Sequence, residues 1–118
     1  MRGWAIAAGL LLACHAHALT AEEALGMAVG ESDARIEALS KAVAQGDDRT
    51  AAFLQALADD AVKLAGGKVL VVRDGQGLDP VTGQAVDLPA DAEDVMLNNR
   101  LRGEIDTALA TLKLVSVD

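Results

Sequence analysis

Nucleophiles, general bases and thiolate or imidazole metal ligands are rare in this chain of 118 residues. The only cysteine is Cys14 and the only histidines are His15 and His17, all within residues 1–18. Catalysis by the rest of the chain would depend on carboxylates, serine and threonine alone. The adjacent acids Asp59-Asp60 and Glu93-Asp94 would point in different directions on a helix, so we interpret them as solvated surface groups. The sequence therefore predicts no enzyme, no metal site and no cofactor.

A pair of glycines after a β-branched segment partly matches two ligand-binding motifs. For a dinucleotide, Gly75-x-Gly77 needs a third glycine or alanine and then a helix, but Pro80 stands at the third position. With Asp79, the same glycines match one copy of a calcium-binding nonapeptide repeat, which works only in tandem arrays. We therefore expect a hairpin turn here.

The most distinctive polar cluster lies in the last third of the chain, around Asn98. One interpretation is that Asn98 caps a helix, with Arg100 and Arg102 on its solvent side. The alternative is a contact surface for another domain or subunit, because arginines beside amides suit hydrogen bonding to backbone and carboxylate groups. The candidate partner-contact residues, including two from a predicted turn, are Asn98, Asn99, Arg100, Arg102, Asp79 and Thr82.

The charge of the chain argues against nucleic-acid binding. The formal net charge is −8, and it becomes one unit more negative if Arg2 is removed with the N-terminal segment. Such a chain repels phosphates. Beyond residue 18, Phe53 is the only aromatic residue, so stacking platforms for bases are also missing.

The N-terminus has the layout of a secretory signal. Arg2 precedes an apolar, uncharged run over residues 4–14, and Ala16-His17-Ala18 supplies the small-x-small cleavage pattern. We expect a signal peptide at 1–18 and an exported, periplasmic domain at 19–118. A lipoprotein acylated at Cys14 is the alternative. After ordinary cleavage no cysteine remains, so packing alone must stabilise the domain.

The pattern of apolar residues predicts a mainly α fold: a HEAT-like bundle of helical hairpins with a small β-hairpin insertion. Thr20 and Glu23 form a capping box that begins the first helix. The third helix has the clearest apolar stripe, from Phe53 to Leu64, and we expect Gly66-Gly67 to end it. The expected helices cover about 21–29, 32–45, 48–65 and 97–113, and the hairpin covers about 68–88.

The order of several segments resembles the N-terminal extracytoplasmic region of the urea ABC transporter permease, of the branched-chain amino acid permease type. The most specific segments are 79–83 (DPVTG) and 98–102 (NNRLR). The others, over nearly the whole of 19–118, are 35–39, 46–49, 53–57, 68–72, 95–97 and 108–114 with Ser116.

This resemblance implies a non-catalytic interaction or scaffold domain of a urea importer. Its partners would be the transmembrane part of the permease, a second permease subunit, ATPase subunits and a periplasmic urea-binding protein, on the periplasmic side of the inner membrane. Residues 19–118 contain no apolar run near the ~20 residues that span a bilayer. Because the chain stops abruptly at Ser116-Val117-Asp118, we expect a fragment of a longer protein. The alternative is a free periplasmic helical adaptor, or the lipoprotein above, with an unknown partner.

Overall fold

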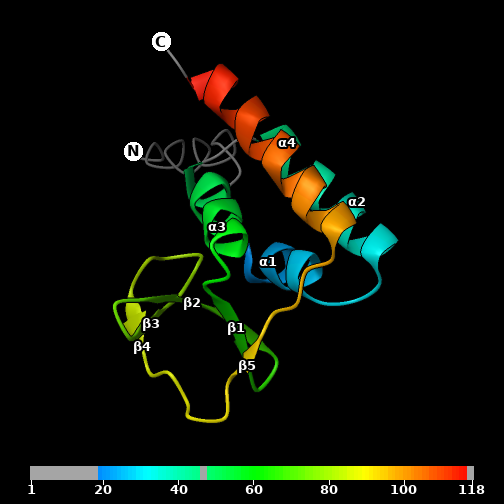
Figure 1. Cartoon of the computed structure of the whole chain (residues 1–118). Coiled ribbons are helices and arrows are strands. Elements are labelled where there is room, and N and C mark those ends of the chain that lie inside the picture. Colours follow the sequence, from blue (N-terminus) through cyan, green and yellow to red (C-terminus); the bar gives the residue numbers. More distant parts are fainter. Residues whose placement is uncertain (1–18, 46–47, 117–118) are drawn as a thin grey trace, which may run out of the picture.

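The computed structural model describes residues 19–45 and 48–116, with side chains as far as Lys113. The predicted signal peptide, 1–18, lies outside the described residues. Within them the fold is mixed α and β, with helices above an antiparallel sheet in the view of Figure 1. In chain order the elements are α1 (Ala21–Ala28), α2 (Ser32–Gln45), α3 (Asp48–Ala58), β1 (Val62–Ala65), β2 (Lys68–Arg73), β3 (Gln76–Leu78), β4 (Ala85–Val86), β5 (Glu93–Asp94) and α4 (Asn99–Ser116).

The first two helices begin and end almost where the sequence predicts. The backbone N–H of Glu23 donates to Thr20 Oγ1 over 3.1 Å, and the backbone N–H of Thr20 donates to Glu23 Oε1 over 2.9 Å. This reciprocal pair confirms the capping box and satisfies N–H groups that the first turn of a helix leaves unpaired. Gly30, with φ +106°, follows α1 and redirects the chain into α2.

The third helix is shorter than predicted, because it ends at Ala58 and residues 62–65 form strand β1. Asp60 adopts a left-handed conformation with φ +58°, and the N–H of Ala61 donates to the carbonyl of Ala56 over 2.8 Å. This is the closing bond of a Schellman motif, which stops a helix. Gly66-Gly67, predicted to end the helix, instead makes the two-residue turn between β1 and β2, with φ +57° and +81°.

The predicted hairpin at 68–88 is part of a larger antiparallel sheet with strand order β4-β3-β2-β1-β5. Asp74-Gly75, both at positive φ, is the turn between β2 and β3, so Gln76 and Gly77 are in a strand and not in the turn. In the last part of the predicted hairpin only Ala85–Val86 form a strand, and this strand pairs with β3 and not with β2. Strand β5 returns from further along the chain to pair with β1.

The core lies between the helices and one face of the sheet. Val62, Val69 and Val71 alternate along β1 and β2 on that face, since neighbouring side chains of a strand point to opposite sides. Phe53 and Leu54 of α3 are 1% and 0% exposed at the centre. Helix α4 contacts both α2 and α3, and α1 contacts β2.

The predicted number of helices is therefore confirmed for the described residues. The prediction of a mainly α fold with a small hairpin is wrong, because the sheet has five strands and the fold is mixed α and β. The reason is that residues 62–65, assigned to a helix, provide the strand to which both β2 and β5 pair. In the described ranges, no helix has the length and apolar character needed to span a membrane.

Candidate interaction site

Asn98 caps helix α4 and ties it to the start of α2. Its Oδ1 accepts from the backbone N–H of Leu101 over 2.8 Å, which confirms the predicted capping. Its Nδ2 donates to Ser32 Oγ, also over 2.8 Å. The same side chain thus holds two helix starts together, although Ser32 and Asn98 lie far apart in the sequence.

The arginines of the cluster are paired within the chain. Arg100 lies 2.9 Å from Asp33 at the start of α2, and Arg102 lies 2.6 Å from Asp60 in the link between α3 and β1. Arg100 nevertheless keeps 59% of its side chain exposed, against 42% for Arg102. Asn99, the first residue of α4, is also exposed. Ion pairs of this exposure are weak, so Arg100 remains able to exchange its partner.

Asp79 and Thr82 shape a tight turn that docks onto α3. Asp79 Oδ1 accepts from the backbone N–H groups of Val81 and Thr82, over 2.7 and 3.3 Å. Arg49 Nη2 donates to the carbonyl of Thr82 over 3.0 Å. Gly83, with φ +79°, lies so close to the Arg49 guanidinium that a Cβ at this position would collide with Nη1.

The candidate contact residues therefore form two groups and not one surface. The turn at Asp79 and Thr82 is held by Arg49, the second residue of α3, whereas Arg102 reaches Asp60 beyond the other end of that helix. Helix α3 has 11 residues, so at 1.5 Å of rise per residue it is about 16 Å long, and Arg49 and Asp60 lie at its opposite ends. Asn98 and Arg100 lie with Arg102 at the start of α4.

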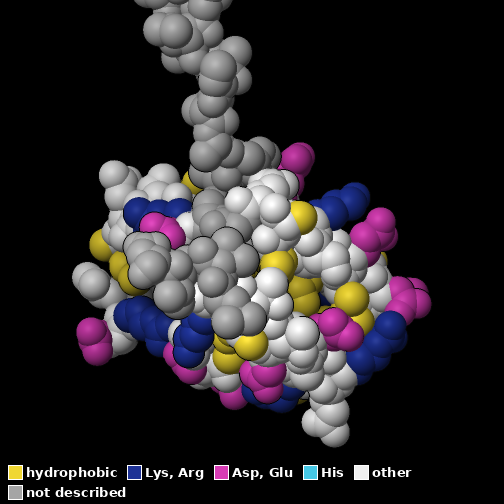
Figure 2. Space-filling model, turned by 90° about the horizontal axis from the view of Figure 1, so that it is seen from above, with side chains coloured by type: hydrophobic (Ala, Val, Ile, Leu, Met, Phe, Trp, Pro, Cys, Tyr) yellow, Lys and Arg dark blue, Asp and Glu magenta, His cyan; other side chains and the backbone are white. Residues whose placement is uncertain are grey.

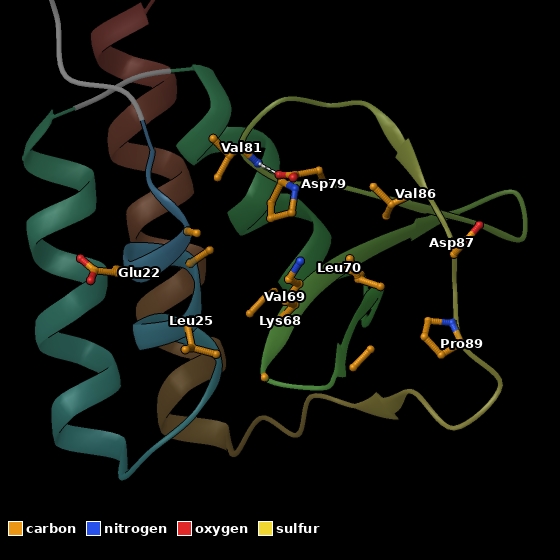
Figure 3. Close-up of a pocket in the computed structure, with 15 residues that line it drawn as sticks. Glu22, Leu25, Lys68, Val69, Leu70, Asp79, Val81, Val86, Asp87 and Pro89 are labelled. Atoms are coloured by element: carbon orange, nitrogen blue, oxygen red, sulfur yellow. Dashed lines mark hydrogen bonds between the residues drawn. The ribbon is translucent and has the colours of Figure 1, made fainter.

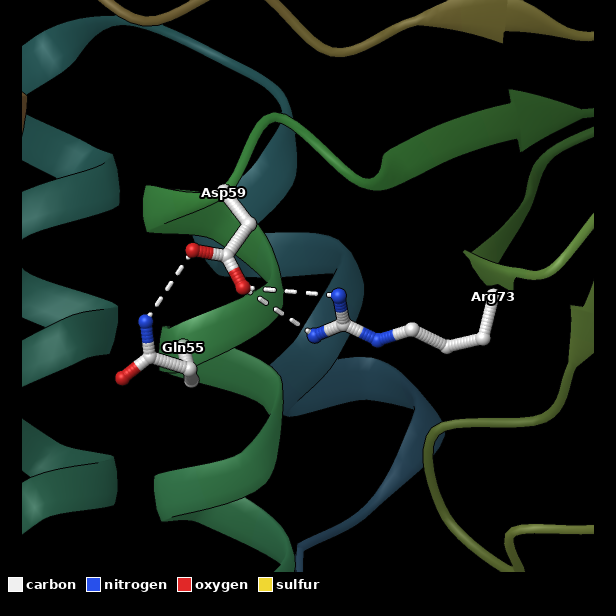
Figure 4. Close-up of polar contacts among 3 residues, drawn as sticks. All are labelled: Gln55, Asp59 and Arg73. Carbon is white, nitrogen blue, oxygen red and sulfur yellow. Dashed lines mark hydrogen bonds and ion pairs between the residues drawn. The ribbon is translucent and has the colours of Figure 1, made fainter.

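Three of the four adjacent acids, Asp59, Asp60 and Asp94, have cationic partners, and none of the four lies on a helix as we expected. Asp59 accepts from Gln55 over 3.1 Å and lies 3.4 Å from Arg73 of β2 (Figure 4). Asp94, in strand β5, lies 2.8 Å from Lys63. Each of these carboxylates faces a cation instead of a second carboxylate, which favours structural ion pairs over paired-acid chemistry.

Arg35 of α2 is a residue that the sequence analysis missed. It is only 8% exposed, and it donates from Nε to the carbonyl of Met27 over 2.9 Å and from Nη1 to the carbonyl of Met96 over 3.0 Å. Its Nη2 is buried without a partner among the described residues. Burial lowers the pKa of this guanidinium below its usual range, because the charged form loses hydration.

Two further surface features lie beside the two groups, one at each. Met96, whose carbonyl binds Arg35, has a side chain that is 76% exposed and lies two residues before Asn98. A cavity of about 440 Å³ lies beside the turn at Asp79, between α1, the first half of β2 and the segments 79–81 and 86–89 (Figure 3). Sequence patterns give no direct signal for either feature.

The face seen in Figure 2 carries basic and acidic side chains next to one another, with apolar groups towards its middle. Within residues 19–45 and 48–116, no group of three or more histidine, cysteine or acidic side chains is arranged to hold a metal ion. Comparison with known proteins finds no matching family, no matching curated protein and no matching solved structure.

Proposed function

We propose that this chain is a non-catalytic interaction domain, the N-terminal extracytoplasmic part of a urea ABC importer permease. The observation that carries the interaction role is the start of α4. There an exposed methionine, Met96, lies close in sequence to the exposed Arg100, and Asn98 holds the helix start in place. Methionine and arginine are enriched at protein interfaces, where an apolar anchor is surrounded by a polar rim.

The order of sequence segments supports the assignment to an importer. The DPVTG and NNRLR segments, at 79–83 and 98–102, have definite structural roles in this domain, as a docked turn and a capped helix start. In this proposal an N-terminal signal directs the chain out of the cytoplasm, and the domain meets the membrane part of the permease or its binding protein. Urea transport belongs to the assembled transporter.

The proposal includes a HEAT-like arrangement for the helical layer. What supports it is that α2 and α3 follow one another in the chain and both pack against α4, while α1 packs against α2. One helical hairpin cannot cover both of its own faces, so it needs neighbours on either side. Helices α1 and α4 are the neighbours that this chain supplies.

The test uses the source gene and its product in cells. We would sequence past codon 118, tag the encoded protein, and compare uptake of labelled urea and co-purification of the other subunits for Met96→Asp, Arg100→Ala and the exposed control Lys41→Ala. We expect Met96→Asp and Arg100→Ala to reduce assembly while the thermal unfolding of the isolated chain stays close to that of the control.

Two results would contradict the proposal. A genuine stop codon after Asp118 would remove the transporter assignment and leave a free periplasmic adaptor, or a lipoprotein if the exported chain carries lipid on Cys14. A continuing frame with unchanged assembly and uptake in both variants would retain the importer but remove the start of α4 as its contact surface.

A further inference from the structure

The ladder between β2 and β3 is incomplete. Strand β3 pairs with β2 from Arg73 back to Val71, and the register ends at the pair Val71 and Leu78. The next residues, Asp79 and Pro80, leave the sheet for the docked turn, and proline has no N–H to offer a ladder. The first half of β2 therefore has a strand beside it on the β1 side only.

The backbone of Val69 points to this unoccupied side. The N–H of Val72 donates to the carbonyl of Ala61 over 2.7 Å, so Val72 directs its backbone groups towards β1. Successive residues of an antiparallel strand alternate in this direction, so Leu70 also faces β1, and Val69 faces the other way. Among the described residues, no strand lies beside Val69 on that side. Its N–H and C=O are thus available to an added strand.

The cavity of about 440 Å³ opens where the two strands diverge. In Figure 3, Leu25 and Val69 lie towards α1, and Val86 and Pro89 lie on the opposite side of the view. Val81 lies above them, beside Asp79. These side chains make the cavity mostly apolar. Its volume falls within the roughly 300–1,000 Å³ of ordinary ligand pockets. Val69 and Leu70, each 7% exposed, line it along the part of β2 that β3 does not cover.

The charge around the cavity selects for a cationic occupant. Glu22, Asp79 and Asp87 line it, and Lys68 is the one cation among its lining residues. The whole stretch from residue 74 to 99 contains no lysine or arginine. The acids in that stretch are Asp74, Asp79, Asp87, Asp91, Glu93 and Asp94.

We propose that this cavity binds an extended segment of a partner protein, which adds a short strand beside Lys68–Leu70. Its backbone pairs with the N–H and C=O of Val69, one apolar side chain enters the cavity between Leu25 and Val86, and a flanking lysine or arginine faces Glu22 or Asp87. Recognition of this kind takes affinity from main-chain hydrogen bonds and specificity from side-chain pockets. The inference does not depend on membership of a transporter.

The probe is a displayed library of random heptapeptides, selected on the purified full chain. We expect enrichment of peptides with β-branched residues and a flanking lysine or arginine. Binding should slow hydrogen exchange at the amide of Val69, read by NMR, and leave the amide of Leu70 unchanged. Methylation of the peptide nitrogen that pairs with Val69 should weaken binding roughly tenfold or more, since it removes one donor and keeps every side chain.

Matched variants locate the site on the protein. Ala21→Trp fills the cavity from an exposed position on α1, and its control Ala110→Trp adds the same side chain to an exposed position on α4. The charge pair is Glu22→Lys with Asp87→Lys, against Glu104→Lys with Asp106→Lys on α4. We expect the variants at the cavity to bind the peptide roughly tenfold more weakly, and the control variants on α4 to bind it as the unchanged chain does.

Other occupants give different results, and each would overturn the proposal. If methylation of no peptide nitrogen weakened binding, the peptide would bind through its side chains without strand pairing, as a small amphiphile would. Concentration-dependent dimerisation that Ala21→Trp abolishes would mean a second copy of the chain. Protection of Val69 in the full chain without any peptide would mean that a segment of the chain itself occupies the cavity.

Discussion

The Nε of Arg35 donates a hydrogen bond to the carbonyl oxygen of Met27 over 2.9 Å, from one turn into α2 back to the last turn of α1. The same guanidinium reaches Met96 in the segment before α4. One buried cation thus joins three parts of the helical layer by their backbones. Its partners are peptide dipoles, so no carboxylate offsets the cost of removing its charge from water.

Replacing Arg35 should therefore destabilise the domain more than replacing a solvated arginine or lysine of the same helix. We expect Arg35→Met to lower the free energy of unfolding by about 2–4 kcal/mol, because it leaves two carbonyl groups without their charged donor. Arg35→Lys should recover only part of this loss, since an ammonium cannot reproduce the fork of the guanidinium. Urea denaturation measures both, with Lys41→Met, at an exposed position of α2, as the control. Equal stability of Arg35→Met and Lys41→Met would contradict the role given to Arg35.

Two glycines offer opposite tests of backbone conformation. Gly67→Ala should cost about 1–2 kcal/mol, because Gly67 has φ +81° in the turn between β1 and β2. Gly103→Ala should instead stabilise by about 0.5–1 kcal/mol, since Gly103 lies inside α4 and an added Cβ meets nothing within 4 Å. Chemical denaturation of both variants checks the signs. If Gly67→Ala stabilised the domain as Gly103→Ala does, the assignment of residues 62–67 to a hairpin would be wrong.

Gly83 should not tolerate substitution, for two reasons. Its φ is +79°, and the Arg49 guanidinium occupies the place where a Cβ would lie. Gly83→Ala should displace Arg49 from the carbonyl of Thr82 and detach the turn from α3. A double-mutant cycle with Arg49→Met isolates this effect from the backbone strain at φ +79°. The loss caused by Gly83→Ala should be smaller in the Arg49→Met background, and strict additivity would refute the contact.

The pair of Arg102 and Asp60 should contribute little to stability despite its short distance. Both side chains are partly exposed, so we expect a coupling of about 0.2–1 kcal/mol from a cycle of Arg102→Met and Asp60→Asn. Asparagine is chosen because it tolerates the left-handed backbone of Asp60. The coupling should decrease in 1 M salt, where the Debye length is about 3 Å. A coupling that salt leaves unchanged would indicate a more desolvated pair.

Local signals predicted the helices well where a cap and a period agreed. The capping box at Thr20 and the run from Ser32 to Gln45 appear in the structure within about one residue of the prediction. The run after Phe53 was assigned wholly to a helix because its apolar residues fit a helical stripe, although Val62 and Leu64 also alternate as a strand requires. The Schellman closure at Asp60 and pairing with β2 decide for the strand, and neither is visible in a local window.

In the candidate site, too, the contacts that depend on local sequence were predicted and the long-range contacts were not. Capping by Asn98 follows from a local preference and was predicted, whereas the partners of Arg100 and Arg102 come from α2 and the α3–β1 link. Arg35 was overlooked because a charged residue at one position of an amphipathic helix is usually solvated. Its burial depends on the carbonyl of Met96, 61 residues later in the chain.

The last strand, β5, consists of Glu93–Asp94 and forms one edge of the sheet. Two neighbouring negative charges on an edge this short discourage another sheet from stacking onto it and extending the ladder. The β5 edge is therefore protected, and we expect strand addition beside the first half of β2, where β3 leaves the ladder. The net charge of −8 should likewise make copies of this chain repel one another, while it attracts a basic segment to the first half of β2.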